Sequence, residues 1–128
     1  MAKKLEREVK VEEHNESTLF HFNNGEPGKR GYAIIHPNIG GTNIPFNIKM
    51  YIPRECAFLS QFYPNGRNAP ELEMRQGKGT QMLNFLIGYL KYKKINAVYC
   101  YSSSESMKQF MKKRSFLELS ITDYLLNF

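Results

Sequence analysis

The sequence predicts a single α/β (α+β) domain with a mixed, mainly antiparallel sheet and a central βαβ unit. Residues 1–63 hold short alternating apolar segments separated by turn residues, which is typical of antiparallel strands. Residues 78–93 carry apolar side chains at spacings of three and four, the period of a helix with one buried face. Two strongly apolar segments, 56–63 and 95–101, flank this helix. Together they predict parallel neighbouring strands joined by a crossover helix.

The other elements follow from local patterns. Alternation predicts early strands over residues 5–12, 19–22 and 31–36, and a fourth over 44–52, where Ile44, Phe46, Ile48, Met50 and Ile52 share one face. Ser102–Ser104 offers caps for a second helix over 105–113. A last strand is expected over 116–122. The tail to Phe128 either extends that strand or forms a short helix.

Length and composition fit one cytoplasmic globular domain spanning residues 1–128. The chain has 128 residues, 41% of them hydrophobic and 23% charged. It has no apolar run long enough for a transmembrane span, and its charged N-terminus is unlike a secretory signal. Cys56 and Cys100 are expected to be free thiols. The three histidines lack metal-ligand spacing, so no metal site is predicted.

The net charge of +6 favours an anionic partner, either a polyanionic cofactor or nucleic acid. Basic residues gather at two predicted helix ends. Because cations suit the negative end of a helix dipole, solvated helix ends are favoured over a nucleic-acid patch. The two clusters are Lys91, Lys93 and Lys94, and Lys108, Lys112, Lys113 and Arg114.

A glycine turn, Arg75–Gln81, opens the long helix. Glycines let the backbone approach a ligand closely, and the free N–H groups of a first helical turn favour an anion such as pyrophosphate. A tight turn without a ligand would need the same glycines. The turn is not a P-loop or a dinucleotide fingerprint, because the required further residues are missing.

The turn resembles the pyrophosphate-binding loop of the GCN5-related N-acetyltransferase (GNAT) superfamily, with pattern Gln/Arg-x-x-Gly-x-Gly/Ala. Gln76, Gly79 and Gln81 take the fixed places, and Gln81 departs from the usual Gly or Ala. The resemblance covers residues 56–121. It implies a GNAT-like fold in which the strands before and after the helix splay apart around the pantetheine arm of acetyl-coenzyme A. Residues 59–63 would then line one wall and residues 99–102 the other.

The resemblance makes residues 76–122 the cofactor half of the domain. The cofactor-binding residues it implies are Phe62, Tyr63, Gln76, Gly77, Lys78, Gly79, Thr80, Gln81 and Ser104. Ser104 stands where the family has Asn. Met111 stands where the family places the tyrosine that commonly serves as general acid. The helices that family members carry after the first strand are not predicted here. A small branch of the superfamily lacks them, and His14-Asn15 and Cys100 match its short motifs.

Candidate catalytic residues are less defined. Tyr101 or Tyr99 could protonate the leaving thiolate, or either could be a packed aromatic residue. Cys100 could carry an acyl group if a neighbour lowers its pKa, or it could be a buried strand residue. Glu55, Glu71 and Glu73 are candidate bases or plain surface carboxylates.

The sequence thus predicts an acetyl-coenzyme A-dependent N-acetyltransferase acting on a small-molecule or protein amine, with no membrane association. Neither the acceptor nor the catalytic competence can be read from the sequence. The alternative is a weak or inactive GNAT-like module that binds an acidic partner or nucleic acid, which is possible but not favoured. The chain is expected to be a monomer, or a homodimer paired through an edge strand.

Overall fold

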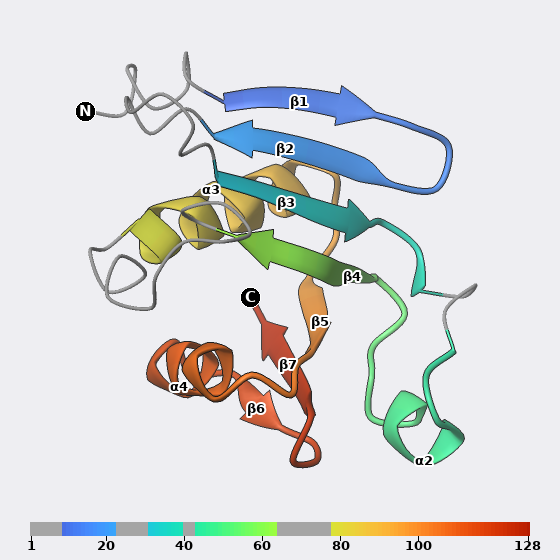
Figure 1. The fold of residues 1–128 in the computed structure, drawn as a ribbon. Coiled ribbons are helices and arrows are strands. Elements are labelled where there is room, and N and C mark those ends of the chain that lie inside the picture. Colours follow the sequence, from blue (N-terminus) through green and yellow to red (C-terminus); the bar gives the residue numbers. More distant parts are fainter. Residues whose placement is uncertain (1–8, 23–30, 40–42, 64–77) are drawn as a thin grey trace.

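The computed structural model describes residues 9–22, 31–39, 43–63 and 78–128. It contains a seven-stranded sheet of order β1-β2-β3-β4-β5-β7-β6. Figure 1 shows the four N-terminal strands side by side, with β5, β7 and β6 turned away from them. All neighbouring strands are antiparallel except β4 and β5, which are parallel. The predicted class, a mixed and mainly antiparallel α+β sheet, is confirmed.

The first three strands form a meander. They are β1 (Val9–Glu13), β2 (Thr18–Phe22) and β3 (Gly31–His36). On β2 and β3 buried and half-buried residues alternate, because successive side chains point to opposite faces of a sheet. The three early strands are confirmed where the structure describes them; residues 5–8 of the first predicted strand lie outside the described residues.

The central βαβ unit is also confirmed. It consists of β4 (Cys56–Tyr63), α3 (Lys78–Tyr92) and β5 (Ala97–Tyr101). The inward stripe of α3 is fully buried at Met82, Leu83, Leu86 and Leu90. At the C-terminal end of α3, the Glu13 carboxylate of β1 accepts a hydrogen bond from the Tyr89 hydroxyl at 2.5 Å and pairs with Lys93 at 3.2 Å. These contacts tie α3 to the first strand.

Different segments of the chain pack against the two faces of the sheet. The first, here called the α3/α4 face, is covered by α3 and by α4 (Glu105–Lys113). Its core contains Phe20 and Ile35 from the meander, and Leu59 and Cys100 from the central strands. On the second, here called the opposite face, Ile39 and residues 43–52 pack over β4, β5 and β7. Over β1–β3, no described helix adds a buried side chain to this face.

The predicted strand over residues 44–52 is wrong. The segment contains a short helix, α2 (Phe46–Lys49), with Pro45 at its N-cap position. Ile44, Ile48 and Ile52 contact the core of the opposite face, whereas Phe46 and Met50 are exposed. The buried residue Ile48 and the half-buried residues Ile44 and Ile52 are therefore four apart, which suits a helical turn, and the period-two alternation of apolar residues was misleading.

The last predicted strand is placed wrongly. Within 116–122 only a two-residue strand forms, β6 (Leu117–Glu118), and the main C-terminal strand is β7 (Asp123–Asn127) in the tail. β7 lies between β5 and β6, where Tyr124 and Leu125 are buried on its two faces. Burial on both faces removes the alternation that identifies an exposed strand. The second helix, α4, forms over the predicted residues.

Candidate active site

The parallel strands β4 and β5 part in the middle of the sheet. They pair only from Cys56↔Ala97 to Leu59↔Cys100. Beyond this point each strand stays with its outer neighbour. Residues 61–63 of β4 continue to pair with β3, while Tyr101 pairs with Asp123 of β7 and the Ser102 N–H donates to the Thr122 carbonyl at 2.9 Å. The splay that the resemblance implied is present.

A β-bulge lies at this parting. Ile35 is opposite Leu59, but Ile34 is opposite Gln61, so Ser60 is the extra residue on β4. A bulge bends its strand and turns backbone groups away from the regular ladder. The bulge thus explains locally why β4 leaves β5 just after Leu59.

The predicted wall residues lie on different faces. Phe62 is buried on the α3/α4 face, with its ring 5.5 Å from that of Phe110 in α4. Tyr63 lies 5.3 Å from the Tyr32 ring. Tyr99 is buried on the opposite face, and its hydroxyl donates to the Asp123 carboxylate. Burial and that carboxylate raise the pKa of Tyr99. Its phenol is therefore a structural hydrogen-bond donor.

Tyr101 directly follows Cys100, the last residue of β5 that pairs with β4. Its side chain is 56% exposed, so it can meet a ligand from solvent. Strand alternation places Tyr101 on the same face as Tyr99. It stands across the parting from Ser60, which follows Leu59, the last residue of β4 that pairs with β5.

The N-terminus of α3 lies within the predicted pyrophosphate loop, whose last four residues, 78–81, form the first turn of the helix. Lys78 is the first residue of the helix, Gly79 is buried, and Gln81 is exposed. Gln76 and Gly77 lie outside the described residues. A buried glycine at a helix start allows close backbone approach, as the resemblance requires.

Arg114 brings a positive charge to the first turn of α3. Its guanidinium donates through Nε to the Thr80 hydroxyl at 3.0 Å and again through Nη2, and it lies 5.1 Å from the Phe110 ring. The sequence suggested a solvated helix end for this residue, and the structure corrects that interpretation. Lys112 and Lys113 of the same cluster are exposed. The contact joins residues 34 positions apart, so no local pattern could have revealed it.

α4 carries the two departures from the family pattern. Ser104 caps the helix, since its hydroxyl accepts from the Met107 N–H at 3.4 Å, and this side chain is exposed. Met111 is fully buried in the core of the α3/α4 face. In the same core, the buried Tyr124 hydroxyl has no hydrogen-bond partner in the structure. Burial, with a smaller effect of Glu118 and Glu105, raises the pKa of Tyr124.

Of two other catalytic candidates, Cys100 faces the core and Glu55 lies away from the parting. The Cys100 thiol is buried on the α3/α4 face, and burial raises its pKa to about 12. A nucleophilic thiol needs the opposite shift, so the thiol behaves as a core side chain. Glu55 is exposed at the other end of β4, about 16 Å from Ser60 at about 3.3 Å per residue. The Cys100 side chain thus faces away from that of Tyr101, and Glu55 lies at the far end of the neighbouring strand.

His36 was not identified from the sequence, yet it lies at the bulge. Its Nε2 is 3.1 Å from the Ser60 hydroxyl, and its Nδ1 is 3.2 Å from the Glu16 carbonyl oxygen. The Ser60 hydroxyl also donates to the Ile34 carbonyl at 3.3 Å. The imidazole stacks on the Phe58 ring at 5.6 Å. His36 and Ser60 are far apart in the sequence, and only the β3–β4 register joins them.

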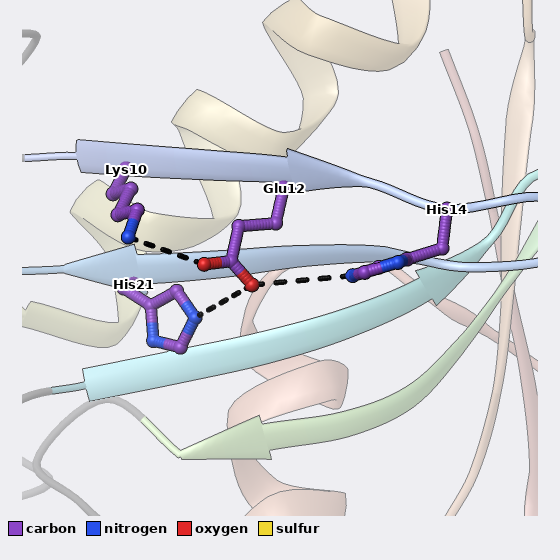
Figure 2. A network of polar contacts seen from close by, with 4 residues as sticks. All are labelled: Lys10, Glu12, His14 and His21. Atoms are coloured by element: carbon purple, nitrogen blue, oxygen red, sulfur yellow. Dashed lines mark ion pairs between the residues drawn. The ribbon is translucent and has the colours of Figure 1, made fainter.

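A second polar group lies on the same face, on β1 and β2 (Figure 2). The Glu12 carboxylate is 3.2 Å from Lys10, 3.7 Å from His21 and 3.9 Å from His14. Lys10 is the main cause of the lowered pKa of Glu12. The group is exposed, so it marks a polar surface and not a buried ionic centre. Among the described residues, no three His, Cys, Asp or Glu side chains are arranged to hold a metal ion.

Comparison with solved structures identifies the fold. Neither the protein-family models nor the curated proteins match the sequence. Tetrahymena GCN5 aligns with a TM-score of 0.57 at 14% identity, over 89% of this chain and 69% of that chain. A protein from Desulfovibrio desulfuricans, described as a putative acetyltransferase of the GNAT family, gives 0.61 at 10% identity, over 88% and 69%.

A third structure was solved with a ligand. PaiA N-acetyltransferase from Thermoplasma acidophilum, in complex with coenzyme A, aligns with a TM-score of 0.55 at 14% identity, over 86% of this chain. This chain spans 58% of the PaiA chain. The described architecture is therefore an acyltransferase-type α+β fold. More specifically, it is the GNAT fold. None of the described helices has the length and apolarity to cross a membrane.

Proposed function

We propose that the protein is an acetyl-coenzyme A-dependent N-acetyltransferase. The observation that carries the proposal is the parting of β4 and β5 directly after Leu59 and Cys100, with a bulge at Ser60. Beyond such a parting, each strand turns one edge of its backbone N–H and C=O groups toward the gap and no longer toward the other strand. Such groups can hydrogen-bond an extended amide-containing arm, and a backbone N–H can stabilise the oxyanion of a polarised carbonyl.

The residues at the N-terminus of α3 fit a pyrophosphate. Gly79 has no side chain that would obstruct a ligand, and the first helical turn supplies N–H donors and the positive end of the helix dipole. Gln76, Gly77 and Lys78 belong to the same proposed site, as does Gln81. Arg114 adds a fixed cation beside Thr80. A guanidinium has five N–H donors, and the Thr80 hydroxyl takes two, which leaves donors for a phosphate.

The chain's own residues would position and protonate the reacting groups. Phe62, at the far end of β4, and Tyr63 would line the arm, and Ser104 would border it from α4. Tyr101 is the proposed proton donor to the leaving thiolate, because it is exposed at the parting. When bound, acetyl-coenzyme A supplies the activated acetyl group. The acceptor is an amine.

The experiment is a thermal melt with acetyl-coenzyme A, with coenzyme A, and with neither. A ligand that binds only the folded chain adds about 2.7 kcal/mol of stability at a hundredfold excess over its dissociation constant. We expect both ligands to raise the midpoint. No shift at millimolar ligand would contradict the proposal and would favour a GNAT-like module that binds an acidic partner or nucleic acid.

The proposed cofactor site can be tested separately from the fold by one residue pair. Replacing Arg114 with Gln removes the cation beside Thr80, whereas replacing exposed Lys113 with Gln removes an equal charge from the end of α4. If net charge alone attracts the ligand, the two variants will weaken binding equally. If the site is at α3, Arg114→Gln will weaken it much more.

A further inference from the structure

We propose that His36, acting through the Ser60 hydroxyl, is the base that takes a proton from the acceptor amine. The inference rests on the proposed acetyltransferase function and adds to it the base and the residue that relays the proton. No sequence pattern assigns either residue a role. The argument depends on their geometry at the bulge.

The first step concerns the imidazole proton. Nδ1 of His36 lies 3.2 Å from the Glu16 carbonyl oxygen. A carbonyl oxygen only accepts, so we assign the proton of the neutral ring to Nδ1. Nε2 then carries the lone pair, and it points at the Ser60 hydroxyl 3.1 Å away. The side chain is thus oriented as a proton acceptor toward the parting of β4 and β5.

The second step concerns the two acceptors around the Ser60 hydroxyl. Its single hydrogen can go to Nε2 of His36 or to the Ile34 carbonyl at 3.3 Å. With neutral His36, the hydroxyl donates to Nε2. With protonated His36, Nε2–H donates to the hydroxyl oxygen, and the hydroxyl hydrogen turns to Ile34. Every polar hydrogen keeps a partner in both states, so the pair can accept a proton without leaving a donor unsatisfied.

The third step concerns position. Ser60 is the first residue of β4 after its last pair with β5, and Tyr101 is the first residue of β5 after the same point. His36 and Tyr101 lie on the opposite face, away from α3 and α4. Ser60, which relays the proton to His36, and the proposed acid Tyr101 therefore stand on the two strands that flank the proposed acetyl site. Tyr101 is 56% exposed on this face, so a ligand can reach it from solvent.

The proton transfers balance as follows. An ammonium nitrogen has no lone pair, so it first gives one proton to the Ser60 oxygen as the hydroxyl proton moves to Nε2 of His36. The freed lone pair then forms the C–N bond to the acetyl carbon, and the C–S bond breaks with its electrons on sulfur. Tyr101 protonates the sulfur and recovers a proton from the new amide nitrogen. His36 returns its proton to solvent, which leaves an acetamide and a free thiol.

The test uses two amines of the same carbon skeleton. Ethylamine is an ammonium ion at neutral pH, whereas trifluoroethylamine is largely neutral because fluorine withdraws electrons. With ethylamine, His36→Gln should lower the transfer rate by about 10²-fold or more, the usual effect of a general base. With trifluoroethylamine, the same variant should change the rate little. Ser60→Ala should follow the same pattern less steeply, and it leaves the imidazole in place.

A second histidine, on the same face of the sheet, serves as the control for loss of a surface imidazole. His21 is on the same face and partly exposed, with its ring near Glu12. His21→Gln should leave both rates unchanged. Thermal melts of each variant, with and without acetyl-coenzyme A, show whether the fold and the cofactor site persist independently of turnover. We expect the ligand-induced shift to remain in all three variants.

The outcomes separate the two proposals. If the parent chain shows neither a melt shift nor transfer, both proposals are overturned. Suppose that the parent chain transfers acetyl groups, but His36→Gln lowers the rates with the two amines equally or changes neither rate. The base assignment is then overturned while the function stands. Intact mass after incubation with acetyl-coenzyme A alone gives one more check. An acetyl group retained on Ser60 would make that residue a nucleophile and would also overturn the assignment.

Discussion

The two faces of the sheet differ most where β4 and β5 part. On the α3/α4 face, the parting is surrounded by a continuous apolar core that includes Leu59, Cys100 and Met111. On the opposite face it is bordered by polar groups, among them Ser60, His36 and exposed Tyr101. A core that excludes water gives rigidity, whereas polar groups at a half-open surface can exchange protons with a substrate. In this sheet, the packed core that stabilises the fold and the residues proposed to transfer protons therefore lie on different faces.

The largest expected effect comes from truncating the apolar face. Leu86 of α3 is 1% exposed in the core of the α3/α4 face, so Leu86→Ala should lower the free energy of unfolding by about 2–5 kcal/mol. Ile34 is half-buried on the opposite face, so Ile34→Ala should cost about 1 kcal/mol. Urea unfolding of both variants measures the difference. Equal losses would mean that the two faces contribute alike to stability.

The next effect concerns two glycines of α3. A side chain at buried Gly79 should crowd the proposed pyrophosphate site, so Gly79→Val should abolish the about 2.7 kcal/mol that a hundredfold ligand excess adds to stability. Gly88 is the control, since an added Cβ there meets nothing within 4 Å. Gly88→Ala should stabilise the helix by about 0.5–1 kcal/mol and leave the ligand shift unchanged. A ligand shift retained in Gly79→Val would contradict the site.

A smaller effect is expected at Arg114. Loss of a charge-assisted hydrogen bond to phosphate costs about 1.5–3 kcal/mol, so Arg114→Gln should weaken coenzyme A binding about 10- to 100-fold. Lys113→Gln should weaken it only slightly, because that side chain is exposed beyond α4. Isothermal titration at two salt concentrations measures both. Equal weakening in both variants would reduce the role of Arg114 to its contribution to net charge.

Two buried tyrosines sharpen the comparison of the faces. Tyr99→Phe removes the hydrogen bond to buried Asp123 and should destabilise the fold by about 1–2 kcal/mol. Tyr124→Phe removes a hydroxyl without a partner in the structure, so it should be neutral or stabilise the fold by about 1 kcal/mol. Thermal unfolding at matched pH compares them. A clear destabilisation by Tyr124→Phe would mean that its hydroxyl is satisfied in solution.

The smallest change is expected when the two cysteine thiols of the folded chain are exposed to an alkylating reagent. Burial raises the pKa of Cys56 and of Cys100 to about 12, so both thiols remain protonated at pH 8. The thiolate is the reactive form, and its fraction rises only as the pH approaches the pKa. Iodoacetamide should therefore modify neither residue in the folded chain and both in urea, as read by intact mass. Rapid modification of Cys100 in the folded chain would restore it as a nucleophile candidate.

Much of the fold could be predicted because its signals are local. The half-buried strand β3, the apolar strand β4 and the capped helix α4 carry their own patterns, and their predicted ranges match the structure. The errors arose where tertiary contacts, and not local patterns, determine which side chains are buried. Residues 44–52 alternate like a strand, but only every fourth residue is buried, and β7 is buried on both faces.

Within the candidate site, only the proposed cofactor side carries a contiguous sequence signal. A glycine turn before an amphipathic helix is a short contiguous signal, so it could be read. The contact of Arg114 with Thr80, and that of His36 with Ser60, join distant segments through helix packing and strand register. The bulge that makes Ser60 the extra residue depends on the partner strand, which no pattern within β4 specifies.

The most direct test of the central claim is amide hydrogen exchange with and without acetyl-coenzyme A. If the ligand lies between the parted strands, amides of residues 60–63 and of the first turn of α3 should exchange more slowly when it is present. Amides of β1 and β2, which carry the polar group of Figure 2, should not change. Protection confined to β1 and β2, with none at residues 60–63, would contradict the account.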